Sequence, residues 1–192
     1  MITVRYLNYP QVLSDPSTPV TLWGLSAVSR ERVAIFSQSR ALRGTSQIAS
    51  SAEKKALETA QSIAAALAIN LEVREAMHEN DRSATGFLPP DEFEVVANKL
   101  FAQPLLSVRG WERAIDAQAR IVREVETVLQ RGLQGDVLFV GHGAVGTLLF
   151  CHYEKADISR AHDQPAGGCH FFTFLKEPRQ ILQPWRRMEE LK

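Results

Sequence analysis

Residues 141–146 read GHGAVG and place a histidine, His142, between two glycines directly after the apolar run 137–140. The six residues match the G-x-G-x-x-G pattern of dinucleotide-binding proteins literally. That pattern also needs a second parallel strand that ends in an acidic residue about 20 residues later, and we find no such acid. We favour an interpretation in which His142 points into a crevice and the N–H groups of the following helix attract an anion. A histidine that only fills the turn explains the motif about equally well.

Residues 50–60 read SSAEKKALETA and carry a second candidate. Two serines precede a predicted helix, and Lys54 and Lys55 fall in its first turn, where a cation opposes the helix dipole and is normally disfavoured. A lysine accepted there indicates an anionic ligand, although a solvated surface charge is the usual explanation. Lys54 fits the usual explanation, whereas Lys55, beside the apolar Ala56, fits the ligand.

The polar segment 78–90 carries two more candidates. Glu79 follows the short predicted strand 71–73, and its carboxyl group is suited to proton transfer. Arg82 is suited to hold a second negative charge of a ligand, but a salt bridge with Asp81 explains it about equally well. The five histidines show no metal-ligand spacing such as HxxxH, so we expect no metal site.

These residues need a scaffold that brings them together. Runs that are apolar or rich in β-branched and aromatic residues predict strands at residues 2–7, 45–49, 71–73, 137–140 and 170–175. Capping residues and helical periodicity predict helices at residues 26–37, 52–68, 91–101, 111–129 and 143–152. The first helix is expected to direct Val28, Val33 and Phe36 to the core, and a tail containing Pro184 follows the last strand.

Alternation of this kind predicts an α/β fold, a three-layer α/β/α sandwich with a mostly parallel central sheet and helices on both faces. We expect residues 1–192 to form a single domain, since no linker or repeat divides them. Ligands of such sheets bind at the carboxyl ends of the strands. The segments 8–9, 50–51, 78–79 and 141–143 all follow predicted strands, so we expect them to line one pocket.

The composition limits the class of ligand. The 192 residues include 22 basic and 22 acidic side chains and carry no net charge, whereas binding to nucleic acid or to a membrane surface needs a basic footprint. The longest apolar run, 63–69, is too short to span a bilayer. No apolar leader follows Met1, and Cys151 and Cys169 do not make a disulfide framework. We therefore expect a cytoplasmic protein that binds neither nucleic acid nor membrane.

Together, the motifs resemble the histidine phosphatase superfamily, also called the phosphoglycerate mutase-like proteins. The resemblance rests on V-G-H-G at 140–143, on S-S-x-x-x-basic-A-x-x-T-A at 50–60 and on L-S-x-x-S at 25–29. Glu79 falls where the family has its acidic proton donor, and Glu112 and Arg120 resemble its Gly-Glu-Ser…Arg pattern. The resemblance implies metal-free phosphoryl transfer, without a cofactor, through a phosphohistidine. It also implies that two arginines and a second histidine bind the phosphoryl oxygens.

The sequence departs from this family at the nucleophile, because no Arg-His-Gly motif follows the first strand. Alignment by strand length places Tyr9 at the nucleophilic histidine and Asn8 at the first arginine, whereas a shorter strand would place Tyr6 at the nucleophile. Lys55 stands at the second arginine, and lysine lacks the planar bidentate grip of arginine. A phenol has a pKa near 10, so about one in a thousand is ionised at pH 7 and the pKa must fall by about 3 units for catalysis. Lys55 and His142 are the groups expected to lower it.

The function expected from these residues is slow or impaired hydrolysis of a small phosphomonoester. The pocket would contain Tyr9, Lys55, Glu79 and His142, with Asn8, Arg82 and Gly143 as substrate-binding residues. The alternative is a catalytically inactive phosphate-ligand sensor or partner-binding module on the same fold, and an unrelated nucleotide binder is a weaker third hypothesis. Either of the first two takes a small phosphorylated molecule or inorganic phosphate. Since a histidine has an ordinary pKa near 6.5, anion binding is expected to strengthen as the pH falls towards about 6.

Overall fold

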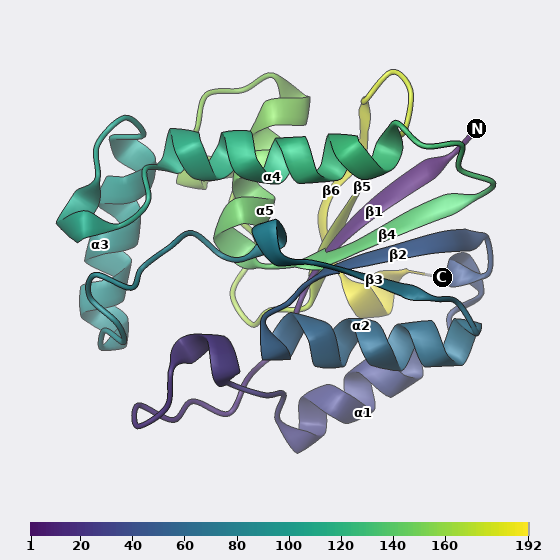
Figure 1. Cartoon of the computed structure of the whole chain (residues 1–192), viewed down its shortest axis with the longest axis horizontal. Coiled ribbons are helices and arrows are strands. Elements are labelled where there is room, and N and C mark those ends of the chain that lie inside the picture. The colour runs from purple at the N-terminus through teal and green to yellow at the C-terminus, as the bar shows by residue number, and fades with distance from the viewer. Residues whose placement is uncertain (192) are drawn as a thin grey trace.

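The computed structural model describes residues 1–191, in which one six-stranded sheet has helices on both faces (Figure 1). The strands are β1 (Thr3–Asn8), β2 (Thr45–Ser51), β3 (Leu71–Arg74), β4 (Asp136–Gly141), β5 (His170–Leu175) and β6 (Ile181–Arg187). Their order in the sheet is β3-β2-β4-β1-β5-β6. The first four strands of this order pair in parallel, whereas β5 pairs antiparallel with each of its neighbours, β1 and β6. The predicted α/β sandwich with a mostly parallel sheet is therefore confirmed.

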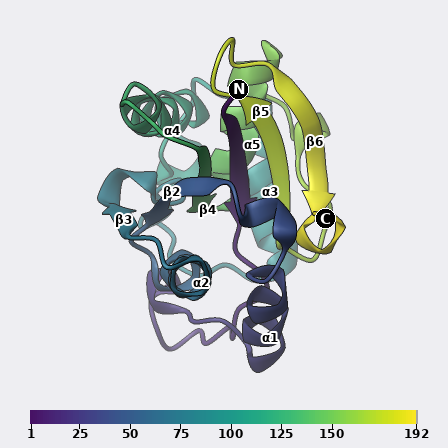
Figure 2. The same ribbon diagram turned by 90° about the vertical axis from the view of Figure 1, so that its right-hand side faces the viewer.

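The helices form the two outer layers (Figures 1 and 2). One face of the sheet is covered by α1 (Ala27–Phe36) and α2 (Lys54–Leu67). The other side holds α3 (Pro90–Ala102), α4 (Ala114–Leu129) and α5 (Gly143–Glu154). Within residues 1–191, none of the helices has the length and apolar character needed to cross a bilayer.

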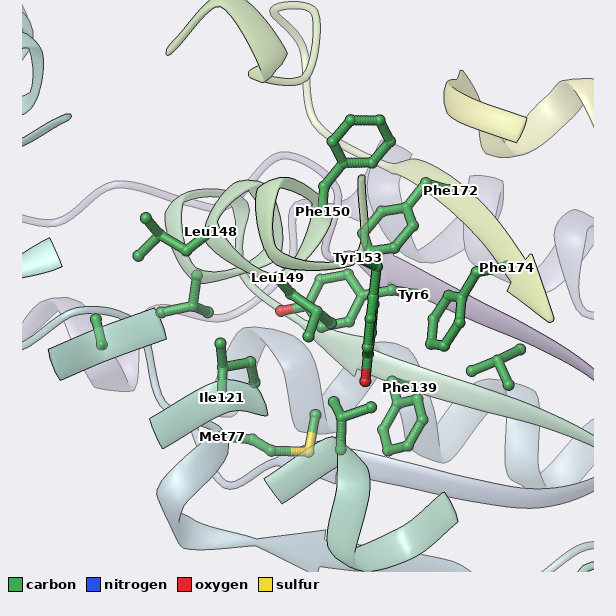
Figure 3. Close-up of a cluster of buried hydrophobic side chains, with 14 of the residues drawn as sticks. Tyr6, Met77, Ile121, Phe139, Leu148, Leu149, Phe150, Tyr153, Phe172 and Phe174 are labelled. Carbon is green, nitrogen blue, oxygen red and sulfur yellow. The ribbon is translucent and has the colours of Figure 1, made fainter. Parts of the chain in front are cut away.

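The central strand β4 divides the core between these layers. Because successive side chains of a strand point to opposite faces, Val137 and Phe139 pack towards α4 and α5, while Leu138 and Val140 pack towards α1 and α2. Figure 3 shows the first of these clusters, in which aromatic rings from β1, β4 and β5 meet apolar side chains of α5. Burial on both faces explains why β4 is a continuous apolar run.

Three elements differ from the sequence predictions. Val28 is 62% exposed, because it lies on a different face of α1 from the buried Ser29 and Val33. Trp111 is buried but precedes α4, which begins at Ala114. The tail after β5 contains the additional strand β6, with Pro184 inside it. A proline is tolerated there because β6 is an edge strand with an irregular register.

The parallel strands all end at the left-hand side of the sheet in Figure 1. Two long connections pass this end. One runs from β1 to α1 and contains the short 3₁₀ turn Val20–Leu22, and the other runs from β3 to α3 through the turn Glu75–Met77. Side chains from β1, β2, β4 and these connections can therefore meet at one place.

Candidate functional site

The four residues expected to form a pocket lie in one cluster at this end of the sheet. Tyr9 follows β1, Lys55 lies in the first turn of α2, Glu79 follows the turn after β3, and His142 stands between β4 and α5. The ring of Tyr9 lies edge-on to the ring of His142, with 5.4 Å between centroids. The Nζ atom of Lys55 is also 5.4 Å from the centroid of the Tyr9 ring. The structure therefore brings these four residues together.

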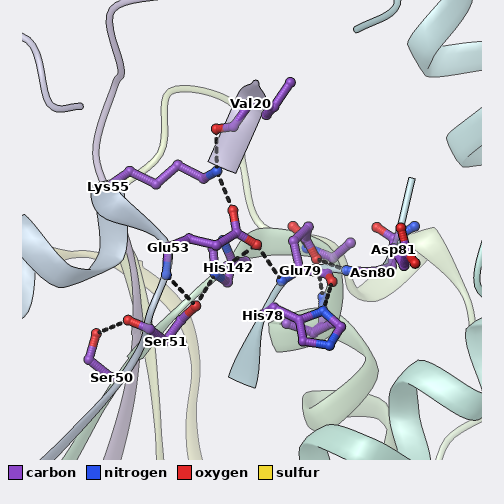
Figure 4. Close-up of polar contacts among 12 residues, drawn as sticks. Val20, Ser50, Ser51, Glu53, Lys55, His78, Glu79, Asn80, Asp81 and His142 are labelled. Atoms are coloured by element: carbon purple, nitrogen blue, oxygen red, sulfur yellow. Dashed lines mark hydrogen bonds and ion pairs between the residues drawn. The ribbon is translucent and has the colours of Figure 1, made fainter. Parts of the chain in front are cut away.

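A fifth residue, Glu53, connects this cluster (Figure 4). One oxygen of its carboxylate accepts a hydrogen bond from Lys55 Nζ. The other accepts from the backbone N–H of Glu79 at 3.0 Å and lies 3.7 Å from His142 Nε2. Glu53 thus contacts three of the four expected residues, although the sequence analysis assigned it no role.

Lys55 is buried together with its counter-ion. Its side chain is only 1% exposed and that of Glu53 10%, and Lys55 Nζ also donates to the carbonyl of Val20 at 2.9 Å. Burial alone would raise the pKa of Glu53, but the charges of His142 and Lys55 and the hydrogen bonds from Lys55 and the Glu79 amide lower it to about 2. The cation at the site is therefore already neutralised by a carboxylate.

His142 is fully buried and held at both ends. Its Nε2 pairs with Ser51 Oγ at 2.8 Å, and its backbone N–H donates to the hydroxyl of Tyr6 at 3.0 Å. Burial lowers the pKa of His142 to about 4, against the opposing effect of Glu53 and Glu79. The ring is therefore neutral at pH 7. The premise that the His142 ring gains its charge near pH 6 does not hold in the unliganded protein, because burial moves that charge to about pH 4.

Glu79 uses its carboxylate to bind the start of α5. Its oxygens accept from the N–H groups of Ala144 at 3.2 Å, Val145 at 3.0 Å and Asn80 at 3.1 Å. The N-terminus of a helix favours a negative charge. The helix end that was expected to attract a ligand anion therefore already holds a protein carboxylate.

The Glu112–Arg120 ion pair fixes the segment that carries Glu79. Arg120 bonds both carboxylate oxygens of Glu112, at 3.0 and 2.7 Å. The same guanidinium donates to the carbonyls of Ala76, His78 and Glu79. Arg120 therefore positions Glu79 through the backbone and does not contact its carboxylate.

Tyr9 is not activated as the sequence analysis required. Burial raises the pKa of its phenol above the ordinary value, the charges of Glu79 and Glu53 raise it further, and only Arg82 opposes them. The expectation that Lys55 and His142 lower this pKa is therefore wrong. Lys55 faces the ring of Tyr9, and its charge is compensated by Glu53. Within residues 1–191, the Tyr9 hydroxyl forms no hydrogen bond with a base.

Asn8 and Gly143 contact a loop of the protein. The Asn8 amide donates to Gln164 and accepts from the backbone N–H of His170 at 2.6 Å. Gln164 also lies against the α-carbon of Gly143, where a side chain would collide with it. The expected substrate-binding role of Asn8 conflicts with these contacts, because its side chain is buried and already paired.

Arg82 is the remaining expected ligand-binding residue. Its guanidinium lies over the rings of Phe93 and Trp111, 5.0 and 5.6 Å from their centroids. The salt bridge with Asp81 is absent from the described part of the chain, since Asp81 accepts instead from the N–H of Ser83. Arg82 is therefore a half-buried cation near the cluster that retains its hydrogen-bonding capacity.

Glu53 was missed because its position has an ordinary explanation. A glutamate at a helix start is favoured by the dipole and needs no further role. The signal that would have found it is its spacing, two residues before the lysine that was assigned to an anionic ligand. In the region 1–191, no group of three or more His, Cys, Asp or Glu side chains is placed to hold a metal ion.

Comparison with known proteins identifies the fold. The model of the histidine phosphatase superfamily (branch 1) matches residues 23–178. A phosphoserine phosphatase mutant from Entamoeba histolytica, in complex with phosphoserine, superposes with a TM-score of 0.81 at 14% identity over 100% of both chains. The Bacillus stearothermophilus protein YhfR gives a TM-score of 0.78 at 18% identity over 95% of each chain.

A third solved structure is the mycobacterial glucosyl-3-phosphoglycerate phosphatase in complex with inorganic phosphate. It superposes with a TM-score of 0.76 at 17% identity, over 97% of this chain and 95% of that one. No curated protein sequence matches the chain. At such low identities these similarities establish the fold.

Proposed function

The chain belongs to the histidine phosphatase superfamily, and from this premise we propose that it binds a small phosphomonoester and hydrolyses it slowly, without a metal. The observation that carries the proposal is that Tyr9, Lys55, Glu79 and His142, which come from four different segments, lie in one cluster. The complexes of similar proteins with phosphoserine and with inorganic phosphate support a small phosphorylated ligand.

Tyr9 is the residue that we assign to the nucleophile position. Tyr6, the alternative, is fully buried, and its hydroxyl is bonded to the backbone carbonyl and N–H of His142. Its ring stacks on Phe172 in the core. Tyr9 is half-buried and faces His142 and Lys55, so it alone of the two can meet a ligand.

The chemistry available at this site explains why turnover would be slow. Lys55 would attract the phosphoryl oxygens, and His142 offers a neutral ring nitrogen beside them. The Tyr9 phenolate would attack phosphorus as the P–O bond of the ester breaks, and the leaving oxygen would take a proton from Glu79 in its acid form. Water would then cleave the phosphotyrosine, releasing inorganic phosphate and returning the proton to the Glu79 carboxylate. Since the pKa of Tyr9 is raised, fewer than about one phenol in a thousand is ionised at pH 7. The attacking group is therefore scarce.

A ligand-binding module without turnover is the second candidate function. It is favoured by the lack of any base bonded to the Tyr9 hydroxyl within residues 1–191 and by the compensated charge of Lys55. In both candidates the whole chain, residues 1–192, acts as one domain in the cytoplasm. The buried, unpaired thiols of Cys151 and Cys169 support that location.

The test is a panel of phosphomonoesters incubated with the parent protein, Tyr9→Phe and Tyr9→His. If Tyr9 is the nucleophile, Tyr9→Phe loses the residual hydrolysis and Tyr9→His exceeds the parent, because a neutral imidazole is a ready nucleophile. Equal rates for the parent and Tyr9→Phe would leave the binding module as the function. If the parent binds no phosphorylated compound, both candidates are wrong.

A further inference from the structure

The carboxylate of Glu53 is bound in the way that proteins bind a small anion. It accepts hydrogen bonds from the ammonium group of Lys55 and from the backbone N–H of Glu79. It also lies beside a ring nitrogen of His142. Charge-assisted donors of these kinds also recognise phosphoryl oxygens. Two of these groups, the Lys55 ammonium and the Glu79 N–H, therefore donate to an oxyanion that belongs to the protein, and His142 lies beside it.

The local structure shows that this arrangement is not ordinary helix capping. Glu53 is the N-cap residue of α2, with φ −64° and ψ 136°, yet its side chain makes no capping hydrogen bond to that helix. A side chain at this position normally accepts from the helix's own N–H groups. The carboxylate turns instead to Lys55 and to the connection that carries Glu79.

The charges that surround the Glu53 carboxylate leave no surplus for a second anion. Lys55 is paired with Glu53, His142 is neutral at pH 7, and Glu79 occupies the start of α5. A phosphoryl group brought next to Lys55 would meet the Glu53 carboxylate at close range. Like charges at such distances repel strongly when they are shielded from water.

We propose that Glu53 is an internal competitor of the ligand, whose carboxylate occupies the position of the phosphoryl group between Lys55 and His142 and must leave before a phosphorylated ligand binds. This inference rests on the proposed function, because it concerns the same site. It makes Glu53 a determinant of affinity. A ligand binds only to the extent that its phosphoryl group contacts Lys55 and His142 better than the glutamate does.

Binding of inorganic phosphate, measured by titration calorimetry, tests the proposal with the parent protein and Glu53→Gln. The amide keeps the shape of the side chain but removes its charge, so we expect phosphate to bind about 10- to 100-fold more tightly, the range of one charge-assisted hydrogen bond. Glu58→Gln is the matched control. Glu58 lies on the same helix, accepts from the Leu25 N–H at 2.9 Å and pairs with Arg30, and phosphate affinity should not change.

The outcomes separate the inference from the function on which it rests. A tighter complex of Glu53→Gln that is lost again in Glu53→Gln/Lys55→Ala supports the inference, as does phosphate binding by Glu53→Gln alone. If the parent binds phosphate and Glu53→Gln binds no more tightly, the inference is wrong and the proposed function stands. If neither binds at millimolar phosphate, both are wrong. Should Glu53→Gln not fold, Glu53→Ala is measured with the same criteria.

Discussion

Breaking the buried ion pair between Lys55 and Glu53 should destabilise the protein strongly. The substitution Lys55→Met keeps the length of the side chain and removes its charge, which leaves the Glu53 carboxylate buried without its main cation. The pKa of Glu53 falls from about 4.5 to about 2 in the folded protein. Each unit corresponds to about 1.4 kcal/mol, so its surroundings stabilise the charge by about 3 kcal/mol.

Lys55 supplies only part of that stabilisation, since the Glu79 amide contributes as well, and His142 does so once it is protonated below about pH 4. Its removal, however, also leaves a desolvated carboxylate, and breaking a buried pair by removing one partner costs about 3–5 kcal/mol in other proteins. We therefore expect Lys55→Met to lower the free energy of unfolding by about 3 kcal/mol. The double variant Glu53→Leu/Lys55→Met should recover most of this loss, because no unpaired charge remains.

Urea unfolding followed by circular dichroism, applied to Lys55→Met, Glu53→Leu and the double variant, gives the coupling energy of the pair. Arg113→Met is the control, because its ion pair with Asp116 is about half exposed and such surface pairs contribute at most about 1 kcal/mol. The reasoning is refuted if Lys55→Met costs no more than Arg113→Met. It is also refuted if the double variant is as unstable as the sum of the two single ones.

Three further predictions concern the same region. Because the pKa of His142 is about 4 when folded and near 6.5 when unfolded, the unfolded state binds more protons and stability should fall by about 3 kcal/mol as the pH drops from about 6.5 to 4. Unfolding of His142→Gln across this range should show a smaller slope, and an unchanged slope would contradict the assignment. Arg120→Met should accelerate amide hydrogen exchange in residues 79–81, because Arg120 bonds the carbonyls of His78 and Glu79 and also pairs with Glu112. Exchange at the parent's rate would argue against a positioning role for Arg120. Gly168→Ala should cost about 1–2 kcal/mol in thermal unfolding, because Gly168 has φ +66° and an added Cβ would lie 3.0 Å from the Tyr9 carbonyl oxygen. An unaltered melting temperature would show that this loop can move aside.

The sequence was sufficient to predict that the four candidate residues lie together, because each comes shortly after a strand. The parallel strands bring their carboxyl ends to one edge, so the sequence alone predicts that Tyr9, Lys55, Glu79 and His142 lie together. The sheet order and the position of Pro184 in β6 were not accessible in this way. A proline excludes a central strand but not an edge strand, and only tertiary pairing decides between them.

The electrostatic state of the site depends on burial, which periodicity alone does not give. The neutral His142 and the raised pKa of Tyr9 both arise chiefly from desolvation. The contact of Glu53 with the Glu79 amide joins two segments that are 26 positions apart. Such a contact leaves no local pattern, so a glutamate at a helix start looked like an ordinary surface residue.

The central position of β4 has a consequence for how the chain folds as it is synthesised. β4 lies between β1 and β2 in the sheet, and the hydrogen bond that joins Tyr6 to His142 spans 136 positions. A nascent chain that ends before residue 136 already contains Tyr9, Lys55 and Glu79 but lacks the strand that separates β1 from β2. Contacts of such high sequence separation slow folding, because a long loop must close before they form. The apolar side chains of β1 therefore stay without their β4 partners until most of the chain has been translated, and such exposed apolar surface is prone to aggregate.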